Sequence, residues 1–218
     1  VPPIASHIDT ALTHLGNHPQ KHGGMVNPPV YHASTVLFDT LADFELAEKG
    51  AYTKGVTYAR YGTPTSHALE EALCAMEGAD HTLIFPSGMA AIATSLLAFV
   101  QSGDHVLMVD STYAPARRFC DQELAKMGVE TTYYPPGIGA GIASLMRDNT
   151  KLVYVESPGS LTFEVQDIPA IAAAAHARGA LVLADKAYTS RANRRYLRSR
   201  GIRACIPSKA DQDAHRKA

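Results

Sequence analysis

The chain has 218 residues, of which 46% are hydrophobic and 19% charged, with a formal net charge of −1. This is an ordinary globular composition, large enough for one substantial domain or two small ones. Three cysteines lack metal-ligand spacing, and their odd number argues against a disulfide framework. The longest apolar run, Ala90 to Val100, is too short to span a bilayer, and the N-terminus does not read as a signal peptide. We therefore expect a cytoplasmic protein without a membrane contact.

Residues 1–65 are rich in His, Pro, Gly and Thr and contain one convincing helix, around Leu41–Glu48. This composition favours an N-terminal extended arm that packs on another surface, such as a partner subunit. A poorly ordered terminus is the alternative that the composition leaves open.

From residue 66 to 185 the hydrophobic pattern alternates between helical and strand periods. Short apolar strands are expected at His81–Phe85, His105–Asp110, Glu130–Tyr134, Lys151–Glu156 and Ala180–Asp185. Helices are expected at Ser66–Glu77, Ser87–Val100, Pro115–Met127, near Ile142–Met146 and at Ile168–Arg178. Continuous apolar strands that alternate with helices predict an α/β fold with a mostly parallel sheet and helices on both faces.

Three features follow predicted strands, where doubly wound sheets bind ligands. Gly88 lies in a strand-to-helix turn whose free N–H groups suit a phosphate, although Ser-Gly before a helix is commonly only a cap. Tyr113 follows the strand that ends at Asp110 and offers a ring face or a phenol, although it could be an ordinary loop aromatic. Asp185 ends the last apolar strand and could hold a protonated ring nitrogen, although a helix N-cap explains it equally well.

The order and spacing of several segments resemble one known family. Residues 57–65 read Thr-Tyr-Ala-Arg-Tyr-Gly-Thr-Pro-Thr, and residues 87–91 read Ser-Gly-Met-Ala-Ala. Residues 102–106, 151–160 and 167–171 continue the match up to Asp185. Together they are similar to the Cys/Met-metabolism enzymes that depend on pyridoxal phosphate (PLP). The Glu-Ser-Pro-Gly-Ser run of 156–160 and the Thr-Tyr-Ala-Pro run of 112–115 resemble the bacterial cystathionine β-lyases in particular.

The resemblance implies an aspartate-aminotransferase-like large domain (PLP fold type I) and a role for each matching residue. Gly88 and Met89 would donate backbone N–H groups to the cofactor phosphate. Tyr58 and Arg60 would reach the phosphate of a neighbouring subunit's cofactor, so a homo-oligomer, a dimer or tetramer, is implied. Tyr113 would stack on the cofactor ring near the substrate amine, as both a binding and a catalytic residue, and Asp185 would keep the ring nitrogen protonated.

The reaction implied is β-elimination from cystathionine, which gives homocysteine, pyruvate and ammonia in transsulfuration and methionine biosynthesis. The substrate is then a small sulfur amino acid. A γ-lyase or γ-synthase of the same family is the alternative.

After Asp185 the resemblance to this family stops. The family's Schiff-base lysine stands in a Ser-Ala-Thr-Lys-type run, which this sequence lacks, and the C-terminal domain is not visible. Lys209 follows Ser208 at nearly the right distance, but Pro207 and the charged residues that follow are typical of a turn and not of a buried strand. We therefore expect a truncated PLP-binding domain over residues 66–185 with little or no lyase activity.

Residues 186–218 differ sharply from the rest in charge. Residues 1–185 carry 10 Lys/Arg and 19 Asp/Glu, a net of −9, whereas residues 186–218 carry 10 and 2, a net of +8. The Asp-Lys-Ala-Tyr run at 185–188 and the arginine-rich stretch after it resemble a fragment of DDE-type insertion-sequence transposases. No metal site can be assembled from this piece alone, and we expect a solvated basic tail. DNA binding through the tail is the alternative.

Overall fold

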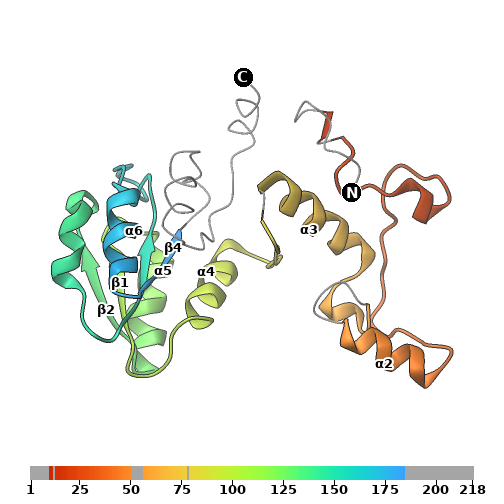
Figure 1. Ribbon diagram of the computed structural model, residues 1–218, viewed down its shortest axis with the longest axis horizontal. Helices are drawn as coiled ribbons and strands as arrows, with labels where there is room; N and C mark the ends of the chain where they lie inside the picture. The colour runs from red at the N-terminus through yellow and green to blue at the C-terminus, as the bar shows by residue number, and fades with distance from the viewer. Residues whose placement is uncertain (1–9, 12, 51–55, 78, 185–218) are drawn as a thin grey trace. The chain divides into compact units, whose positions relative to one another are not determined.

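The computed structural model describes residues 10–11, 13–50, 56–77 and 79–184. The chain divides into two units, Val1–Ile84 and Phe85–Ala218, each of which is described by itself (Figure 1). The boundaries at residues 65 and 185 that the sequence suggested stay predictions.

Short helices make up the described part of the first unit. They are the 3-10 helices η1 (Pro19–His22) and η2 (Ala59–Tyr61) and the α-helices α2 (Leu41–Lys49) and α3 (Pro64–Glu77). The Thr40 hydroxyl caps α2 by accepting a hydrogen bond from the Asp43 N–H (3.1 Å). The two α-helices confirm the helices predicted there. Among the described residues of this unit only Ala11 and Gly16 are buried, so this segment forms no core of its own.

The second unit is built on a four-stranded parallel sheet with the strand order β2-β1-β3-β4. The strands are β1 (His105–Val109), β2 (Glu130–Tyr134), β3 (Thr150–Val155) and β4 (Leu181–Ala184). Strand β1 is buried along its whole length and pairs with β2 on one side and β3 on the other. The α/β prediction is therefore confirmed.

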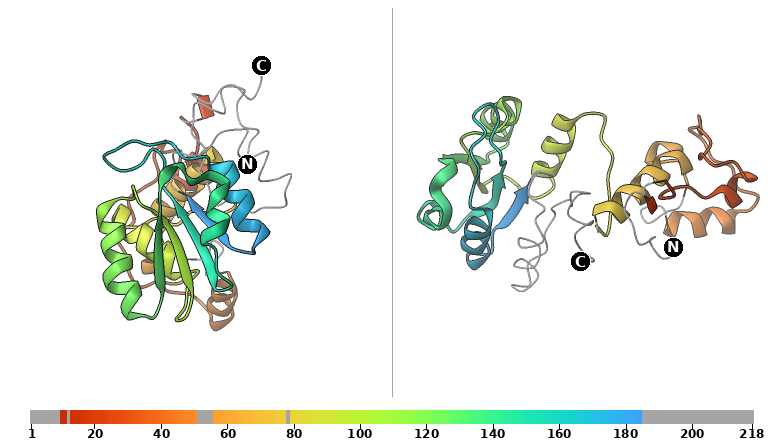
Figure 2. Two further views of the ribbon diagram at one scale, coloured as in Figure 1. Left: turned by 90° about the vertical axis from the view of Figure 1, so that its left-hand side faces the viewer. Right: turned by 90° about the horizontal axis from the view of Figure 1, so that it is seen from above.

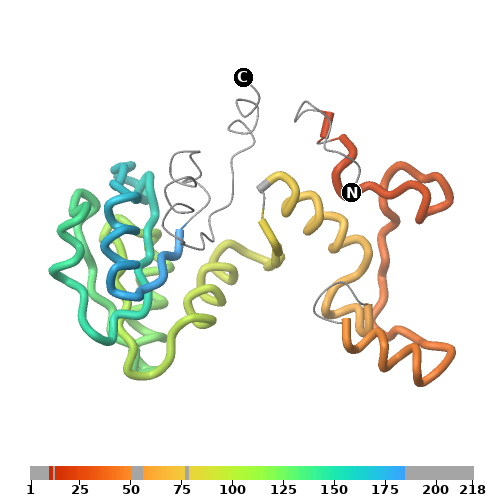
Figure 3. Tube along the Cα trace, in the orientation of Figure 1, coloured from red at the N-terminus to blue at the C-terminus, as the bar shows by residue number. Residues whose placement is uncertain are grey.

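Helices cover both faces of this sheet (Figures 1 and 2). They are α4 (Gly88–Leu97), α5 (Ala114–Phe119), the π-helical turn η3 (Cys120–Leu124), the 3-10 segment η4 (Pro136–Leu145) and α6 (Ile168–Ala177). The Ser87 hydroxyl caps α4 by accepting from the Ala90 N–H, and the Asp167 carboxylate caps α6 by accepting from the Ala170 N–H (both 3.1 Å). The path of the chain from β1 through α5 and η3 to β2 is clear in Figure 3.

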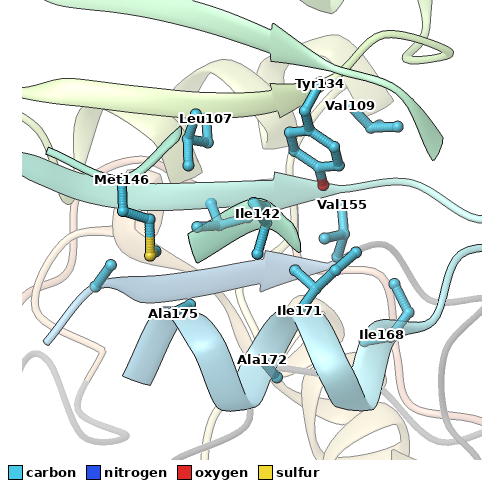
Figure 4. Packing of buried hydrophobic residues seen from close by; sticks show 12 residues of the cluster. Leu107, Val109, Tyr134, Ile142, Met146, Val155, Ile168, Ile171, Ala172 and Ala175 are labelled. Atoms are coloured by element: carbon cyan, nitrogen blue, oxygen red, sulfur yellow. The ribbon is translucent and has the colours of Figure 1, made fainter. Parts of the chain in front are cut away.

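Two apolar clusters enclose the sheet, because successive strand residues point to opposite faces. Leu107 and Val109 of β1 pack with α6 and η4 (Figure 4). Val106 and Met108 pack on the other face with Leu96 of α4 and with η3. Cys120 belongs to this second cluster, and burial raises the pKa of its thiol to about 11, so the thiol is a packed and protonated group.

Two predicted elements take a different form. The strand predicted at His81–Phe85 is wrong, because this segment pairs with none of the four strands and Leu83 is 76% exposed. An extended segment becomes a strand only when a neighbour takes up its backbone hydrogen bonds. The helix predicted near Ile142–Met146 is the end of the 3-10 segment η4, which is interrupted at Gly139 (φ 49°). Among the described residues, no helix has the length and apolar character needed to cross a bilayer.

A buried histidine links three strands at the amino edge of the sheet. His105 is fully buried, and its ring nitrogens lie 2.8 Å from the hydroxyls of Thr150 in β3 and Thr132 in β2. Burial, followed by the nearby Arg147 charge, lowers the pKa of His105 below its ordinary 6.5, while Glu130 acts in the opposite direction. The neutral imidazole is therefore the form that the fold accommodates.

We predict that the second unit loses stability in mild acid because of His105. The unfolded imidazole binds a proton more readily than the folded one, so the stability is present above pH 6.5 and falls as the pH drops below it. His105→Gln should lower stability by about 1–3 kcal/mol near neutral pH and flatten the acid slope. Urea unfolding at several pH values measures both effects. His176, whose pKa burial also lowers, contributes to the slope that remains. An unchanged slope in His105→Gln would contradict the prediction.

Candidate functional site

The carboxyl ends of β1 and β3 bring two loops together at one edge of the sheet. The strands are parallel neighbours, so the residues that follow Val109 and Val155 emerge on the same side. The first loop is 110–113 and the second is 156–166. This edge is where sequence reasoning expected the ligand.

Tyr113 stands at the end of the first loop and begins α5 as its N-cap residue. Its carbonyl oxygen accepts from the N–H groups of Ala116 (2.9 Å) and Arg117 (3.2 Å). Its side chain makes no capping hydrogen bond and is 46% exposed. The residue is therefore partly open to solvent, and its predicted role toward a cofactor stays a prediction.

Hydrogen bonds join the two loops. The N–H of Ser160 donates to the carbonyl of Ser111 (2.7 Å). One carboxylate oxygen of Glu156 accepts from the Thr112 hydroxyl and from the Tyr113 N–H, each at 3.1 Å. These hydrogen bonds hold the two loops in a fixed position relative to each other.

Arg117 fixes the helix that Tyr113 begins. Its guanidinium pairs with the Asp110 carboxylate, donates to the Asp110 carbonyl (2.7 Å) and lies 3.7 Å from the ring centroid of Tyr133. The Tyr133 hydroxyl in turn donates to Asp121 (2.6 Å), and burial together with this carboxylate raises the pKa of Tyr133 well above its ordinary value. The start of α5 is thus tied to β1 and β2.

Gly88 and Met89 occupy the first turn of α4 in the same unit. Amides in a first helical turn have no acceptor within the helix, and the positive end of the helix dipole favours an anion. Gly88 is exposed, and a Cβ atom added to it would meet no atom within 4 Å. The turn therefore leaves room for a phosphate group. Helix α4 also contacts α5, which Tyr113 begins.

Tyr58 and Arg60 lie together in the first unit. Tyr58 precedes η2, and the Arg60 guanidinium lies 5.0 Å from the ring centroid of Tyr58 and 5.4 Å from that of Tyr61. Gly62 ends this turn with φ 128°, and a side chain there would collide with His67. No carboxylate among the described residues forms an ion pair with Arg60.

The remaining predictions lie outside the described residues. Asp185, predicted to hold the ring nitrogen, and Lys209, the alternative Schiff-base lysine, both belong to residues 185–218. Within the described part of the chain, no three His, Cys, Asp or Glu side chains gather to hold a metal ion.

Sequence reasoning gave no role to Glu156 or Thr112, which the structure places at the site. Glu156 belongs to the Glu-Ser-Pro-Gly-Ser run, but its partners lie 43 and 44 positions away in the sequence. Its position directly after a buried strand was the one available signal.

Comparison with known proteins identifies relatives of the whole described region. The family profile for "Cys/Met metabolism PLP-dependent enzyme" matches residues 9–200. A Rhizobium johnstonii protein provisionally named cystathionine beta-lyase is 52% identical over 183 residues, which cover 84% of this chain and 45% of that protein. Cystathionine beta-lyase MetC of Escherichia coli is 42% identical over 167 residues, which cover 77% of this chain and 42% of that protein.

A solved structure shows the same fold. The crystal structure of metB from Corynebacterium glutamicum matches with a TM-score of 0.75 and 29% identity, over 87% of this chain and 47% of that one. The expected fold of PLP enzymes of type I is confirmed by this match. The chain spans about half the length of the relatives it matches, and the family match continues past residue 185 to residue 200.

We predict that Gly159 is required for the close contact between the two loops. A Cβ atom on this buried glycine would lie 2.7 Å from the Ser111 Cβ, closer than real atoms approach. Gly159→Ala should therefore lower the free energy of unfolding by about 1–3 kcal/mol, and adding Ser111→Gly should restore most of it. Gly137→Ala, where an added Cβ meets nothing within 4 Å, is the control. Chemical denaturation measures all three, and equal effects of the two alanines would contradict the prediction.

Proposed function

Because the chain belongs to the Cys/Met metabolism PLP-dependent enzyme family, we propose that it carries part of the cofactor site of a carbon–sulfur β-lyase that acts on cystathionine. The observation that carries the proposal is that the second unit contains both an open helix N-terminus at Gly88 and the exposed ring of Tyr113, at the starts of two helices that contact each other. The similarity to cystathionine β-lyases supports the substrate.

The described residues fit pyridoxal phosphate. The backbone N–H groups of Gly88 and Met89 would bind the phosphate, and the space around Gly88 accommodates it. Arg60, which has no described carboxylate partner, would pair its planar guanidinium with phosphate oxygens of a second copy's cofactor. The Tyr113 ring would stack on the cofactor, and its hydroxyl would face the substrate amine. Asp185 would hold the ring-nitrogen proton.

When bound, pyridoxal phosphate supplies an electron sink for a carbanion next to the substrate's amino group. The chain's own residues contribute binding and orientation: the helix amides hold the anion, and the tyrosine ring fixes the plane of the cofactor. In a complete protein of the family, β-elimination from cystathionine followed by hydrolysis with one water would release homocysteine, pyruvate and ammonia.

Exposed apolar side chains in the first unit support a homo-oligomer. Val30, Leu37 and Leu41 are 69%, 90% and 71% exposed, and burying such surface against a second chain is favourable. Three expectations from the sequence stay predictions. They are the cytoplasmic location, the γ-lyase or γ-synthase alternative, and the transposase-like or DNA-binding tail at 186–218.

We predict that the 218-residue chain binds the cofactor through Tyr113. Titration with deoxypyridoxine phosphate, which lacks the aldehyde and cannot label surface lysines, should saturate. Tyr113→Ala should weaken binding about tenfold because stacking is lost, while Tyr113→Phe keeps the affinity. Tyr31→Ala removes a tyrosine of similar exposure (43% against 46%) and serves as the control. The absence of saturable binding by the unmodified chain would contradict the proposed function.

We further predict that the 218-residue chain releases no pyruvate from cystathionine above background. Its sequence has no Ser-Ala-Thr-Lys-type run to supply the Schiff-base lysine. Borohydride reduction with pyridoxal phosphate, followed by peptide mapping, should give only scattered labelling. A single stoichiometric adduct on Lys209, together with PLP-dependent pyruvate release that Lys209→Ala abolishes, would show instead that the tail has been recruited.

A further inference from the structure

We propose that Glu156 is the positioning residue for Tyr113, so that a carboxylate in the loop after β3 sets the direction of a ring in the loop after β1. The inference that this ring serves a cofactor rests on the proposed function. The positioning itself follows from the contacts at the carboxyl edge.

The carboxylate acts on the backbone of the Tyr113 loop. The Tyr113 N–H and the Thr112 hydroxyl both donate to the same Glu156 oxygen, each at 3.1 Å. Thr112 is buried, with 6% exposure, so its hydroxyl needs this acceptor. Tyr113 has φ −52° and ψ 124°, outside the helical region, and its N–H therefore lies before the hydrogen-bonding pattern of α5. The bond to Glu156 thus fixes the residue at the point where the chain turns from strand to helix.

Hydrogen bonds from Gln166 hold the backbone around Glu156 in place. The side-chain amide of Gln166 donates to the Glu156 carbonyl (2.8 Å), and the Gln166 N–H donates to the Ser157 hydroxyl (2.8 Å). Gln166 is 6% exposed, and its Oε1 lies 3.1 Å from the hydroxyl of fully buried Tyr134. The single hydroxyl proton of Tyr134 lies between two acceptors, this Gln166 oxygen and the Tyr154 carbonyl (2.9 Å), and is shared by them. Figure 4 shows the hydroxyl next to Val155 at the end of β3.

A continuous chain of polar contacts therefore runs from the core to the exposed ring. It begins at Tyr134 in β2, passes through Gln166 to Glu156 at the end of β3, and reaches Tyr113 at the start of α5. Burial raises the pKa of Tyr134 far above its ordinary value, so its hydroxyl stays a donor. Charged hydrogen-bond acceptors hold their donors more tightly than neutral ones. In this arrangement the Glu156 carboxylate is the group that contacts the Tyr113 backbone directly.

Amide hydrogen exchange of the full 218-residue chain without cofactor tests the positioning. In Glu156→Ala, exchange at the Tyr113 amide should rise about tenfold or more, while the buried amides of β1 keep their protection and show that the sheet is folded. Glu156→Gln, whose side-chain oxygen can still accept both bonds, should stay within about threefold of the unmodified chain.

Glu164→Ala is the matched control. Glu164 lies in the same loop, and its carboxylate accepts from Thr162 and not from the Tyr113 loop. Equal exchange at Tyr113 in Glu156→Ala and Glu164→Ala would overturn the proposal.

A cofactor titration separates this inference from the proposed function. In Glu156→Ala, the circular-dichroism signal of bound deoxypyridoxine phosphate should fall while that of Glu164→Ala is kept, because the ring that orients the cofactor is no longer held. If the unmodified chain binds no cofactor, the proposed function fails, and the exchange data still decide whether Glu156 positions Tyr113. An unchanged signal in Glu156→Ala would overturn the role toward the cofactor.

Discussion

The parallel pairing of β1 with a neighbour on each side is the constraint on which the second unit depends. All five residues of β1 are buried, so the strand must satisfy its backbone through β2 and β3 and its side chains through helices on both faces. Polar contacts then secure both of its ends: His105 links it to Thr132 and Thr150 at the amino edge, and Glu156 links it to β3 at the carboxyl edge. The central strand is thereby fixed along its whole length.

The fixed position of β1 also holds the Tyr113 loop at the carboxyl edge in place. A tyrosine on a loop would ordinarily sample several directions, because loops carry few packing contacts. In this protein, Arg117 holds the helix that follows Tyr113, Glu156 holds the amide of Tyr113 itself, and Gly159 allows the two loops to touch. An exposed ring is thus supported by two half-buried charged side chains and a close loop contact, which is the kind of support that a cofactor-stacking residue needs.

Membership of the PLP-dependent family is the common basis of the proposed roles of these features, which are divided between the two units. The second unit offers amides and an aromatic ring, whereas the first offers the Tyr58–Arg60 turn, whose guanidinium lies over two tyrosine rings. Binding needs only these complementary groups, whereas reaction also needs a lysine in the right sequence context. Under the proposed function, this chain, which spans about half of its relatives, would carry cofactor-binding groups of the family.

The sequence by itself determined the elements whose signals are local. The apolar runs of β1 and β3 and the serine before α4 could be read from the sequence, because each depends on residues close together in the chain. The segment His81–Phe85 looked like a strand yet has no partner, and the helix near Ile142–Met146 became part of a 3-10 segment. Strand pairing and tight loop geometry depend on residues that are distant in the sequence, and a local sequence pattern does not identify them. Only the tertiary structure decided that Glu156 holds Tyr113, because two loops 43 residues apart meet only when β1 and β3 lie side by side in parallel.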